Sequence, residues 1–284
     1  CAKKCEYCAF YSEGTNGAKI ERYVDALLTE IHTHSPLAQP KTMFFGGGTP
    51  SLLTIDQWAR IFRAFQKVGW NSIDEFTVEC NPATVSEAKA NLFLENGVNR
   101  ISMGVQSLDE DLLDRLGRGH SRDMVFRSFR TLRDAGFRNI NLDLMFAIPG
   151  QTEAIWERTL AEILDFGSEH LSCYEVIYEE DTPLYEQLKA GEFDVDEALA
   201  SDMYEILIDR LSQNGFEQYE IANFARVTDQ AAKGIPGYAC RHNVNYWVGG
   251  EYLALGPAAA GHLDGQRYQN WSNTDLYCEA VKAG

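Results

Sequence analysis

Residues 42–80 read TMFFGGGTPSLLTIDQWARIFRAFQKVGWNSIDEFTVEC, and this stretch determines the class of fold. A short apolar run at 42–45 leads into a glycine-rich turn, an amphipathic segment at 55–68 and a second apolar run at 75–80. Thr54 is placed to cap the amphipathic segment as a helix, and Gly69 is placed to end it. A strand, a helix and a strand in this order predict a βα unit with parallel strands.

The same alternation continues on both sides of this unit. Apolar runs at 100–105, 139–145 and 170–175 predict strands, and amphipathic patterns at 20–32, 86–96, 124–135 and 153–166 predict helices. Ser86 is a candidate N-cap, and Gly97 and Gly136 follow helix ends. Five strands, with a sixth expected before Cys1, predict an α/β fold: a partial (β/α)6 barrel that lacks its first strand. A three-layer doubly wound sheet is the alternative.

The alternation weakens after Glu175, which predicts two parts. We assign residues 1–175 to the barrel core and residues 176–284 to a C-terminal α+β extension. One further helix is expected near residues 197–214, and a glycine-rich tail spans residues 234–265.

Composition narrows the classes of function. The chain has 284 residues, of which 45% are hydrophobic, enough for a sizeable core, yet no run approaches the ~20 apolar residues of a membrane span. A net charge of −17 argues against nucleic acid as the main partner. The seven cysteines form a triplet and four scattered singles rather than an even disulfide framework. This usage predicts a cytoplasmic location, where thiols stay reduced.

The triplet stands at the start of the chain, where CAKKCEYC places Cys1, Cys5 and Cys8 on one loop. Three thiolates can hold three irons of a cubane iron–sulfur cluster and leave the fourth iron open. A zinc site and a disulfide are the alternatives, but zinc needs four closed ligands and usually shows a second paired motif. Because no residue precedes Cys1, we expect the loop to be poorly anchored.

Polar residues gather where the predicted strands end. The glycine-rich FFGGGTP, residues 44–50, follows the first strand, and glycine lets a backbone approach a ligand closely. The later strand ends and loops carry Glu79, Asn81, Gln106, Ser107, Arg118 and Asp143. Each of them could instead cap a turn or lie on the surface. Because the carboxyl ends of barrel strands form active sites, their convergence beside a cluster favours a binding site.

Six motifs, CAKKCEYC, GGGTP, VECNP, GVQS, LGRGHS and NLDLMFAIPGQT, occur in an order and spacing that resemble the radical S-adenosylmethionine (SAM) enzymes. The chain is most similar to the branch of the oxygen-independent coproporphyrinogen III oxidase. The resemblance implies a [4Fe–4S] cluster on Cys1, Cys5 and Cys8, with SAM chelating the open iron through its amino and carboxylate groups. It assigns Gly46, Gly47, Gly48 and Thr49 to the amino group of SAM, Arg118 to its carboxylate, and Glu79, Gln106 and Asp143 to its ribose and adenosine.

The tail resembles the heme chaperones of the HemW type. The similar segments are CRHNVNYW, residues 240–247, and YEIANFAR, residues 219–226. The resemblance implies His242 as an axial ligand of heme iron, with Tyr246 and Trp247 offering flat apolar surface to the porphyrin. A histidine among aromatic residues is often a hydrogen-bonded packing residue instead, and this alternative stays open.

The chain departs from its relatives at two places. The oxidases carry a further cysteine two positions after the triplet, where this chain has Phe10, and this favours the chaperone. The segment that usually reads G-x-G-x-H in heme chaperones is GPAAAGHL here, with Ala260 in the expected histidine position and His262 two residues on. This difference suggests a divergent branch.

The resemblance implies a leading function and two alternatives. The leading hypothesis is a heme chaperone on a radical SAM scaffold, whose partners are heme, recipient hemoproteins and an electron donor for the cluster. The alternatives are coproporphyrinogen III oxidase activity, in which a deoxyadenosyl radical decarboxylates propionates, and a radical SAM enzyme that acts on heme. Contact with a membrane would come through membrane-bound clients, because the sequence shows no basic amphipathic helix.

Overall fold

Five parallel strands form the inner wall of the protein in a computed structural model, which describes residues 1–284 except 2, 15 and 229–234. The strands are β1 (Thr42–Phe45), β2 (Glu75–Cys80), β3 (Arg100–Gln106), β4 (Ile140–Phe146) and β5 (His170–Glu175). They lie side by side in the order of the sequence, and each pairs in parallel with the next. These are the five strands expected from the apolar runs, with ends that differ by one residue at β3 and β4.

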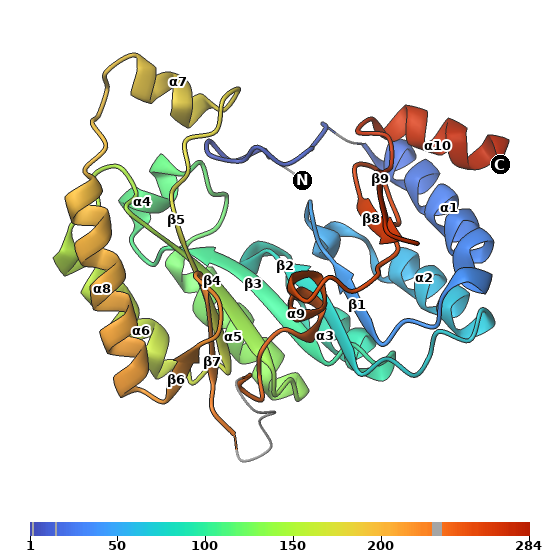
Figure 1. Ribbon diagram of the computed structural model, residues 1–284, viewed down its shortest axis with the longest axis horizontal. Helices are drawn as coiled ribbons and strands as arrows, with labels where there is room; N and C mark the ends of the chain where they lie inside the picture. The colour runs from blue at the N-terminus through green and yellow to red at the C-terminus, as the bar shows by residue number, and fades with distance from the viewer. Residues whose placement is uncertain (2, 15, 229–234) are drawn as a thin grey trace.

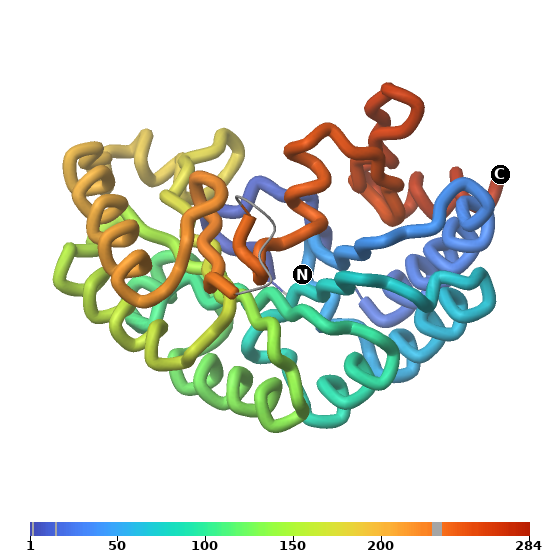
Figure 2. The backbone as a smooth tube through the Cα atoms, turned by 60° about the horizontal axis from the view of Figure 1, so that its bottom comes forward, coloured from blue at the N-terminus to red at the C-terminus, as the bar shows by residue number. Residues whose placement is uncertain are grey.

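The helices between the strands cover the convex face of this curved sheet (Figure 1 and Figure 2). They are α1 (Gly17–His34), α2 (Ile55–Lys67), α3 (Glu87–Glu95), α5 (Arg122–Ala135) and α6 (Glu153–Asp165), with α8 (Glu197–Gln213) beside α6. A doubly wound sheet reverses its strand order and carries helices on both faces. Because this sheet does neither, the partial barrel is confirmed and the doubly wound alternative is wrong.

The C-terminal extension completes one edge of the same sheet. β7 (Asn223–Arg226) pairs antiparallel with β5, and β6 (Phe216–Gln218) pairs with β7 at the edge. The expected division at residues 175 and 176 therefore passes through one continuous sheet, and the division stays a prediction. So does the strand expected before Cys1.

The predicted caps work through hydrogen bonds at the helix ends. Thr54 forms a capping box with Gln57 at the start of α2, and the Ser86 side chain accepts from the Lys89 backbone at the start of α3. Several further elements were not expected, and in most of them too few residues repeat to show a period. These are α4 (Glu110–Arg115), α7 (Pro183–Lys189), α9 (Arg241–Trp247), α10 (Thr274–Ala283), β8 (Ala260–Leu263), β9 (Gln266–Gln269) and the 3-10 turns Ser35–Leu37, Pro50–Leu52 and Pro82–Thr84.

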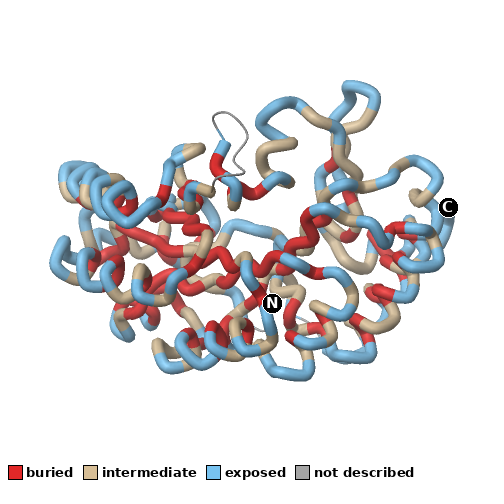
Figure 3. Tube along the Cα trace, turned by 90° about the horizontal axis from the view of Figure 1, so that it is seen from below, coloured by how far each residue is buried: buried red, intermediate tan, exposed pale blue. Residues whose placement is uncertain are grey.

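The two faces of the sheet differ in chemistry. Buried stretches of the chain run through the middle of the molecule (Figure 3). Side chains facing the helices are apolar and buried, for example Phe76, Ile101, Leu142 and Leu171. Alternate positions face the inside of the half-barrel, and most of the buried ones are polar, among them Thr77, Arg100, Ser102, Asn141, His170 and Ser172. Buried polar groups are costly unless they are hydrogen-bonded, so this lining points to function rather than to stability alone.

The end of the chain folds back onto α1. Glu30 on α1 is buried, and its carboxylate accepts hydrogen bonds from the Gly256 backbone (2.7 Å), the Asn270 amide (2.8 Å) and the Tyr277 hydroxyl (2.6 Å). α10 packs beside α1 (Figure 1). Within the described residues, no helix combines the length and the apolar character that crossing a membrane requires.

Candidate functional site

The cysteine loop is anchored by the barrel helices. The Glu6 backbone N–H donates to the Leu116 carbonyl at 3.0 Å, and the Leu184 N–H donates to the Glu6 carbonyl at 2.9 Å. The loop therefore lies between the end of α4 and the start of α7, above the carboxyl ends of the strands (Figure 1). The expectation of a poorly anchored loop is wrong, because these two backbone hydrogen bonds do not depend on any preceding strand.

The three thiols of this loop are free and partly exposed. Cys1 Sγ lies 3.3 Å from Thr49 Oγ1, and Cys5 Sγ accepts a hydrogen bond from Arg118 Nη1 at 3.5 Å. A single zinc ion would draw its thiolates to about 2.3 Å from itself. In the described part of the chain, no three His, Cys, Asp or Glu side chains gather tightly enough to hold one metal ion. Three free thiols on one loop, with Arg118 beside Cys5, are the donor set of a cubane cluster, in which each thiolate binds a different iron.

The glycine-rich turn is pressed against Glu79. A Cβ atom added to Gly46 would lie 2.6 Å from the Phe44 ring and 2.7 Å from Glu79 Oε1, so a side chain does not fit there. Gly47 has a φ of +93°, which glycine adopts readily, and its N–H donates to Glu79 Oε2 at 3.1 Å. The structure thus joins the turn and the second strand, as the sequence predicts.

Two carboxyl groups inside the half-barrel repel each other. Burial, with the nearby charge of Asp143, raises the pKa of Glu79 to about 8. Burial also raises the pKa of Asp143 to about 6, against the opposing effects of Asn141 and Arg100. Among the described residues, neither carboxyl group has a cation within ion-pair distance. A pair of this kind suits a cationic ligand, and SAM carries an ammonium and a sulfonium.

Arg118 and Gln106 meet at an irregular end of β3. Arg118 Nη2 donates to the Gly104 carbonyl at 2.6 Å, and Nη1 reaches the Tyr7 hydroxyl at 3.5 Å, so Arg118 is not an ordinary surface arginine. Gln106 is buried with a φ of +66°, and the pairing of β3 with β4 shifts register there. Non-glycine residues in this region are uncommon and cluster at functional sites.

These contacts bring most of the predicted cofactor residues together. Direct contacts link Cys1 to Thr49, Cys5 to Arg118, and Gly47 to Glu79. The charge of Asp143 acts on Glu79 and helps to raise its pKa, so Asp143 belongs to the same group of residues. Tyr7 was not foreseen: it lies between two cysteines and contacts Arg118, and its place in CEYC was the available signal. The roles of these residues toward SAM stay predictions.

The HNVNYW segment forms α9 near the amino ends of β1 and β2. Glu75, the first residue of β2, is buried, and its carboxylate accepts from the backbone N–H groups of Arg241 and His242, both at 2.9 Å. The Cys240 thiol donates to the same carboxylate at 3.5 Å. This anchor was not foreseen, and its available signal was a glutamate at the first position of a largely apolar strand.

His242 is hydrogen-bonded through both ring nitrogens. Nδ1 lies 2.8 Å from Thr42 Oγ1 and Nε2 lies 2.6 Å from the Tyr246 hydroxyl. The ring stacks on Phe44, with centroids 5.5 Å apart and planes 26° apart. Tyr246 and Trp247 are 41% and 48% exposed. The histidine is therefore packed and bonded, whereas Tyr246 and Trp247 are open to solvent over part of their surface.

An aromatic row continues from α9 toward the glycine-rich tail. The rings of Tyr246 and Tyr252 lie 4.3 Å apart, and those of Tyr252 and His262 lie 6.1 Å apart. His262 and Tyr252 also exchange backbone hydrogen bonds of 2.9 Å. His262 thus stands at the far end of a row that begins at His242.

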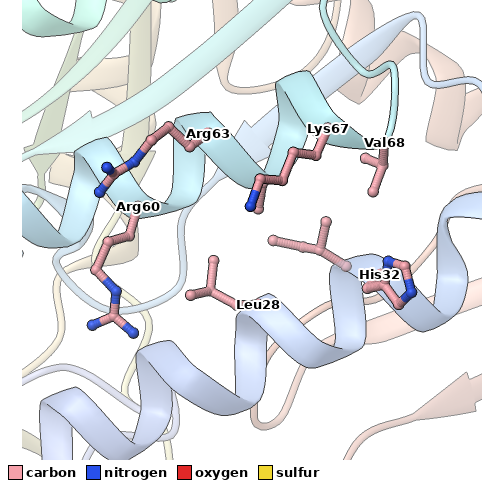
Figure 4. A pocket seen from close by; sticks show the side chains of 8 residues that line it. Leu28, His32, Arg60, Arg63, Lys67 and Val68 are labelled. Atoms are coloured by element: carbon pink, nitrogen blue, oxygen red, sulfur yellow. The ribbon is translucent and has the colours of Figure 1, made fainter.

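A basic groove of about 380 Å³ lies elsewhere, between α1 and α2 (Figure 4). Its floor includes Leu28 and Val68, and His32, Arg63 and Lys67 stand around it. It is on the outer, helical side of the molecule and contains none of the residues predicted from the motifs.

Comparisons with known proteins agree with the resemblances that the sequence motifs indicate. The radical SAM superfamily model matches residues 1–163. The heme chaperone HemW of Lactococcus lactis subsp. lactis is 34% identical over 283 residues, which are 99% of this chain and 72% of that protein. The heme chaperone HemW of Bacillus subtilis is 36% identical over 287 residues, which are 99% of this chain and 73% of that protein.

A solved structure shares the fold. The coproporphyrinogen III oxidase (HemN) of Escherichia coli superposes with a TM-score of 0.83 at 24% identity, covering 100% of this chain and 67% of that one. At this identity the likeness concerns the fold alone. A [4Fe–4S] cluster and SAM are the cofactors that the superfamily match implies. The chain belongs to the radical SAM superfamily and, within it, to the family of the heme chaperone HemW.

Proposed function

We propose that this chain is a heme chaperone that binds heme on α9 and passes it to hemoproteins. The observation that carries the proposal is the arrangement on α9, where a histidine held by the barrel lies beside the exposed side chain of Tyr246, and Trp247 is exposed at the end of the same helix. Flat aromatic surface suits a porphyrin face, and imidazole is a common axial ligand of heme iron.

The surroundings of His242 suit iron ligation through Nε2. Burial lowers the pKa of His242, which keeps the ring neutral at physiological pH, as ligation requires. When Thr42 Oγ1 accepts from Nδ1–H, the free lone pair is on Nε2, facing the Tyr246 hydroxyl. A ligating histidine commonly donates its other N–H in this way. Heme then displaces only the hydroxyl of a half-exposed tyrosine.

The scaffold keeps the residues for both cofactors of its superfamily. We assign the [4Fe–4S] cluster to Cys1, Cys5 and Cys8, with Arg118 beside Cys5. We assign SAM to Gly46, Gly47, Gly48, Thr49, Glu79, Gln106, Arg118 and Asp143. When bound, these groups supply one-electron cleavage of SAM. The seven free cysteines fit a reducing compartment, so we place the chain in the cytoplasm. An electron donor would approach the cluster loop, where Phe10 is 72% exposed.

Heme titration of three variants tests the binding site. We expect His242→Ala to weaken heme binding by at least about tenfold and to shift the Soret band, because the iron loses its nitrogen ligand. Tyr246→Phe should bind heme as tightly as the wild type or more tightly, because the competing hydroxyl is gone. His32→Ala, an exposed histidine on α1, is the matched control. An unchanged spectrum and affinity in His242→Ala would overturn the proposal.

Two further assays separate chaperone from enzyme. Heme-loaded protein should transfer heme to an apo-hemoprotein such as apomyoglobin. Anaerobic incubation of the cluster-loaded protein with SAM, dithionite and coproporphyrinogen III should form no protoporphyrinogen. Its formation would favour the oxidase instead, and breakdown of heme under the same conditions would favour an enzyme that acts on heme.

A further inference from the structure

A line of hydrogen bonds crosses the polar lining of the half-barrel, from Asp143 on β4 to the start of α9. The Asn141 amide nitrogen lies 2.7 Å from Asp143 Oδ1, and its amide oxygen lies 2.6 Å from His170 Nδ1. His170 Nε2 lies 2.6 Å from the Tyr219 hydroxyl, which accepts from the Cys240 backbone N–H at 3.0 Å. These residues lie far apart in the sequence, and the fold brings them into one line.

The Asp143 end, together with a neutral His170 ring, fixes the direction of the hydrogen bonds in this line. The ionised Asp143 carboxylate can only accept and the Cys240 backbone N–H can only donate. The Asn141 NH2 group therefore faces Asp143, and its oxygen accepts from His170 Nδ1–H. His170 Nε2 is then a bare acceptor, which receives the Tyr219 O–H. Each group donates toward Asp143. The Asn141 amide also donates to Ser102 Oγ at 2.7 Å and accepts from Ser172 Oγ at 3.2 Å, and both bonds require the same orientation of the amide.

The middle of the line is buried and fully bonded. Asn141 is 1% exposed and His170 is 0% exposed. Burial and the Arg100 charge hold the pKa of His170 well below its usual range, so the ring keeps the one donor and one acceptor that the line needs. Hydrogen bonds in such a low-dielectric interior polarise one another, so a change at one end affects the others.

Tyr219 touches α9 at both of its ends. It accepts from the backbone of Cys240, just before the helix, and its ring lies 5.8 Å from the ring of Trp247, the last helical residue. Glu75 holds the first turn of the helix from another strand. A change at Tyr219 can therefore shift the helix against Glu75 without releasing it.

We infer that His170 and Tyr219 are positioning residues that couple ligand binding at Asp143 to heme binding on α9. The inference rests on the proposed function. A ligand diol that donates to the Asp143 carboxylate competes with the Asn141 amide. The weaker bond at that end weakens the line as far as Cys240 and loosens α9. SAM therefore lowers the affinity for heme, and by linkage heme lowers the affinity for SAM by the same factor.

Heme titrations with and without SAM test this coupling. The cluster-loaded protein is used without reductant, so that SAM stays intact. In the wild type we expect saturating SAM to raise the heme Kd by about fivefold, the lower end of typical couplings. Tyr219→Phe removes both hydrogen bonds of the hydroxyl. In this variant the ratio of the heme Kd with SAM to the heme Kd without SAM should fall to within about twofold of one. The SAM Kd with and without heme should show the same two factors.

The control is Tyr204→Phe. The Tyr204 hydroxyl donates to the Ile221 carbonyl at 2.9 Å and accepts from Gln218, so it holds the same turn as Tyr219 but lies outside the line. It should keep the wild-type ratio. His170→Leu is the second variant, for the case that Tyr219→Phe does not fold, and it should lose the coupling too.

The outcomes separate the two proposals. If the wild type binds no heme, the proposed function fails. If it binds heme with a Kd that SAM does not change, the coupling fails and the proposed function stands. A full wild-type ratio in Tyr219→Phe and His170→Leu would overturn the role of this line of residues.

Discussion

Glu79 makes the stability of the protein depend on pH in an unusual direction. Its pKa rises from an ordinary 4.5 to about 8, chiefly through burial. Between these values the folded protein holds a proton on Glu79 that the unfolded chain has lost. The neutral form therefore favours the folded state fully below about pH 4.5, and this contribution is lost as the pH rises through 8. Most carboxylates in folded proteins act in the opposite direction.

We therefore expect Glu79→Gln to stabilise the protein without ligands. The amide keeps the shape of the neutral acid and cannot ionise. At pH 8.5 its free energy of unfolding should exceed that of the wild type by about 1–2 kcal/mol, a fraction of the full shift because Glu79 is partly exposed to solvent. At pH 5 the difference should be small. Urea unfolding at both pH values measures it.

The exposed Glu192→Gln is the control for that comparison, and it should behave like the wild type at both pH values. Glu79→Gln should also bind SAM more weakly, because the ribose and adenosine side of SAM loses a carboxyl acceptor. A variant no more stable than the wild type at pH 8.5 would contradict the raised pKa.

At the scale of elements, α9 depends on the barrel for its existence. It has seven residues, and the side chain of its N-cap residue, Cys240, forms no capping hydrogen bond. Helices this short are unstable alone in water, because nucleation costs more than the few hydrogen bonds return. The buried carboxylate of Glu75 serves as the missing cap, since it accepts from two of the first N–H groups and carries the charge that a helix start favours.

Glu75→Gln should loosen this helix. The amide has one oxygen in place of two, so one of the two backbone N–H groups loses its acceptor. We expect the free energy of unfolding to fall by about 1–3 kcal/mol, the usual cost of an unsatisfied buried group. The heme Kd should rise, and the fluorescence of Trp247 should shift.

Asp56→Asn is the matched control, because Asp56 is an acid in the first turn of α2 but is exposed. It should leave both measurements unchanged. Equal heme affinity in Glu75→Gln and the wild type would show that α9 holds its position by other contacts.

The same elements show how far sequence reasoning reaches. The five strands and their helices were predictable, because each repeats a pattern over enough residues to identify its type. So was the gathering of Gly47, Glu79 and Arg118, since parallel strands end at one edge. The partners of α9 were not predictable. Thr42 and Glu75 meet it across 200 and 166 positions of sequence, and no local pattern encodes such pairings.

For the whole molecule, Glu30 fastens the end of the chain to its beginning. Its buried carboxylate accepts from three groups between positions 256 and 277. Glu30→Ala leaves these donors without a partner, so we expect the free energy of unfolding to fall by about 3 kcal/mol. Limited proteolysis should cut the segment after Gly256 sooner than in the wild type.

Glu95→Ala, which removes an exposed charge from the end of α3, is the control and should resist proteolysis like the wild type. Equal cleavage in Glu30→Ala and the wild type would mean that packing of α10 on α1 suffices to hold the segment.

The ring of Phe44 borders both the proposed SAM site and the proposed heme site. One part of its ring lies against the position of Gly46, where SAM is assigned, and His242 stacks on the ring. A larger or smaller side chain at this single position would therefore reshape the surroundings of both proposed sites. A substitution that adapts one site to a new ligand would also have to keep the packing on which the other depends.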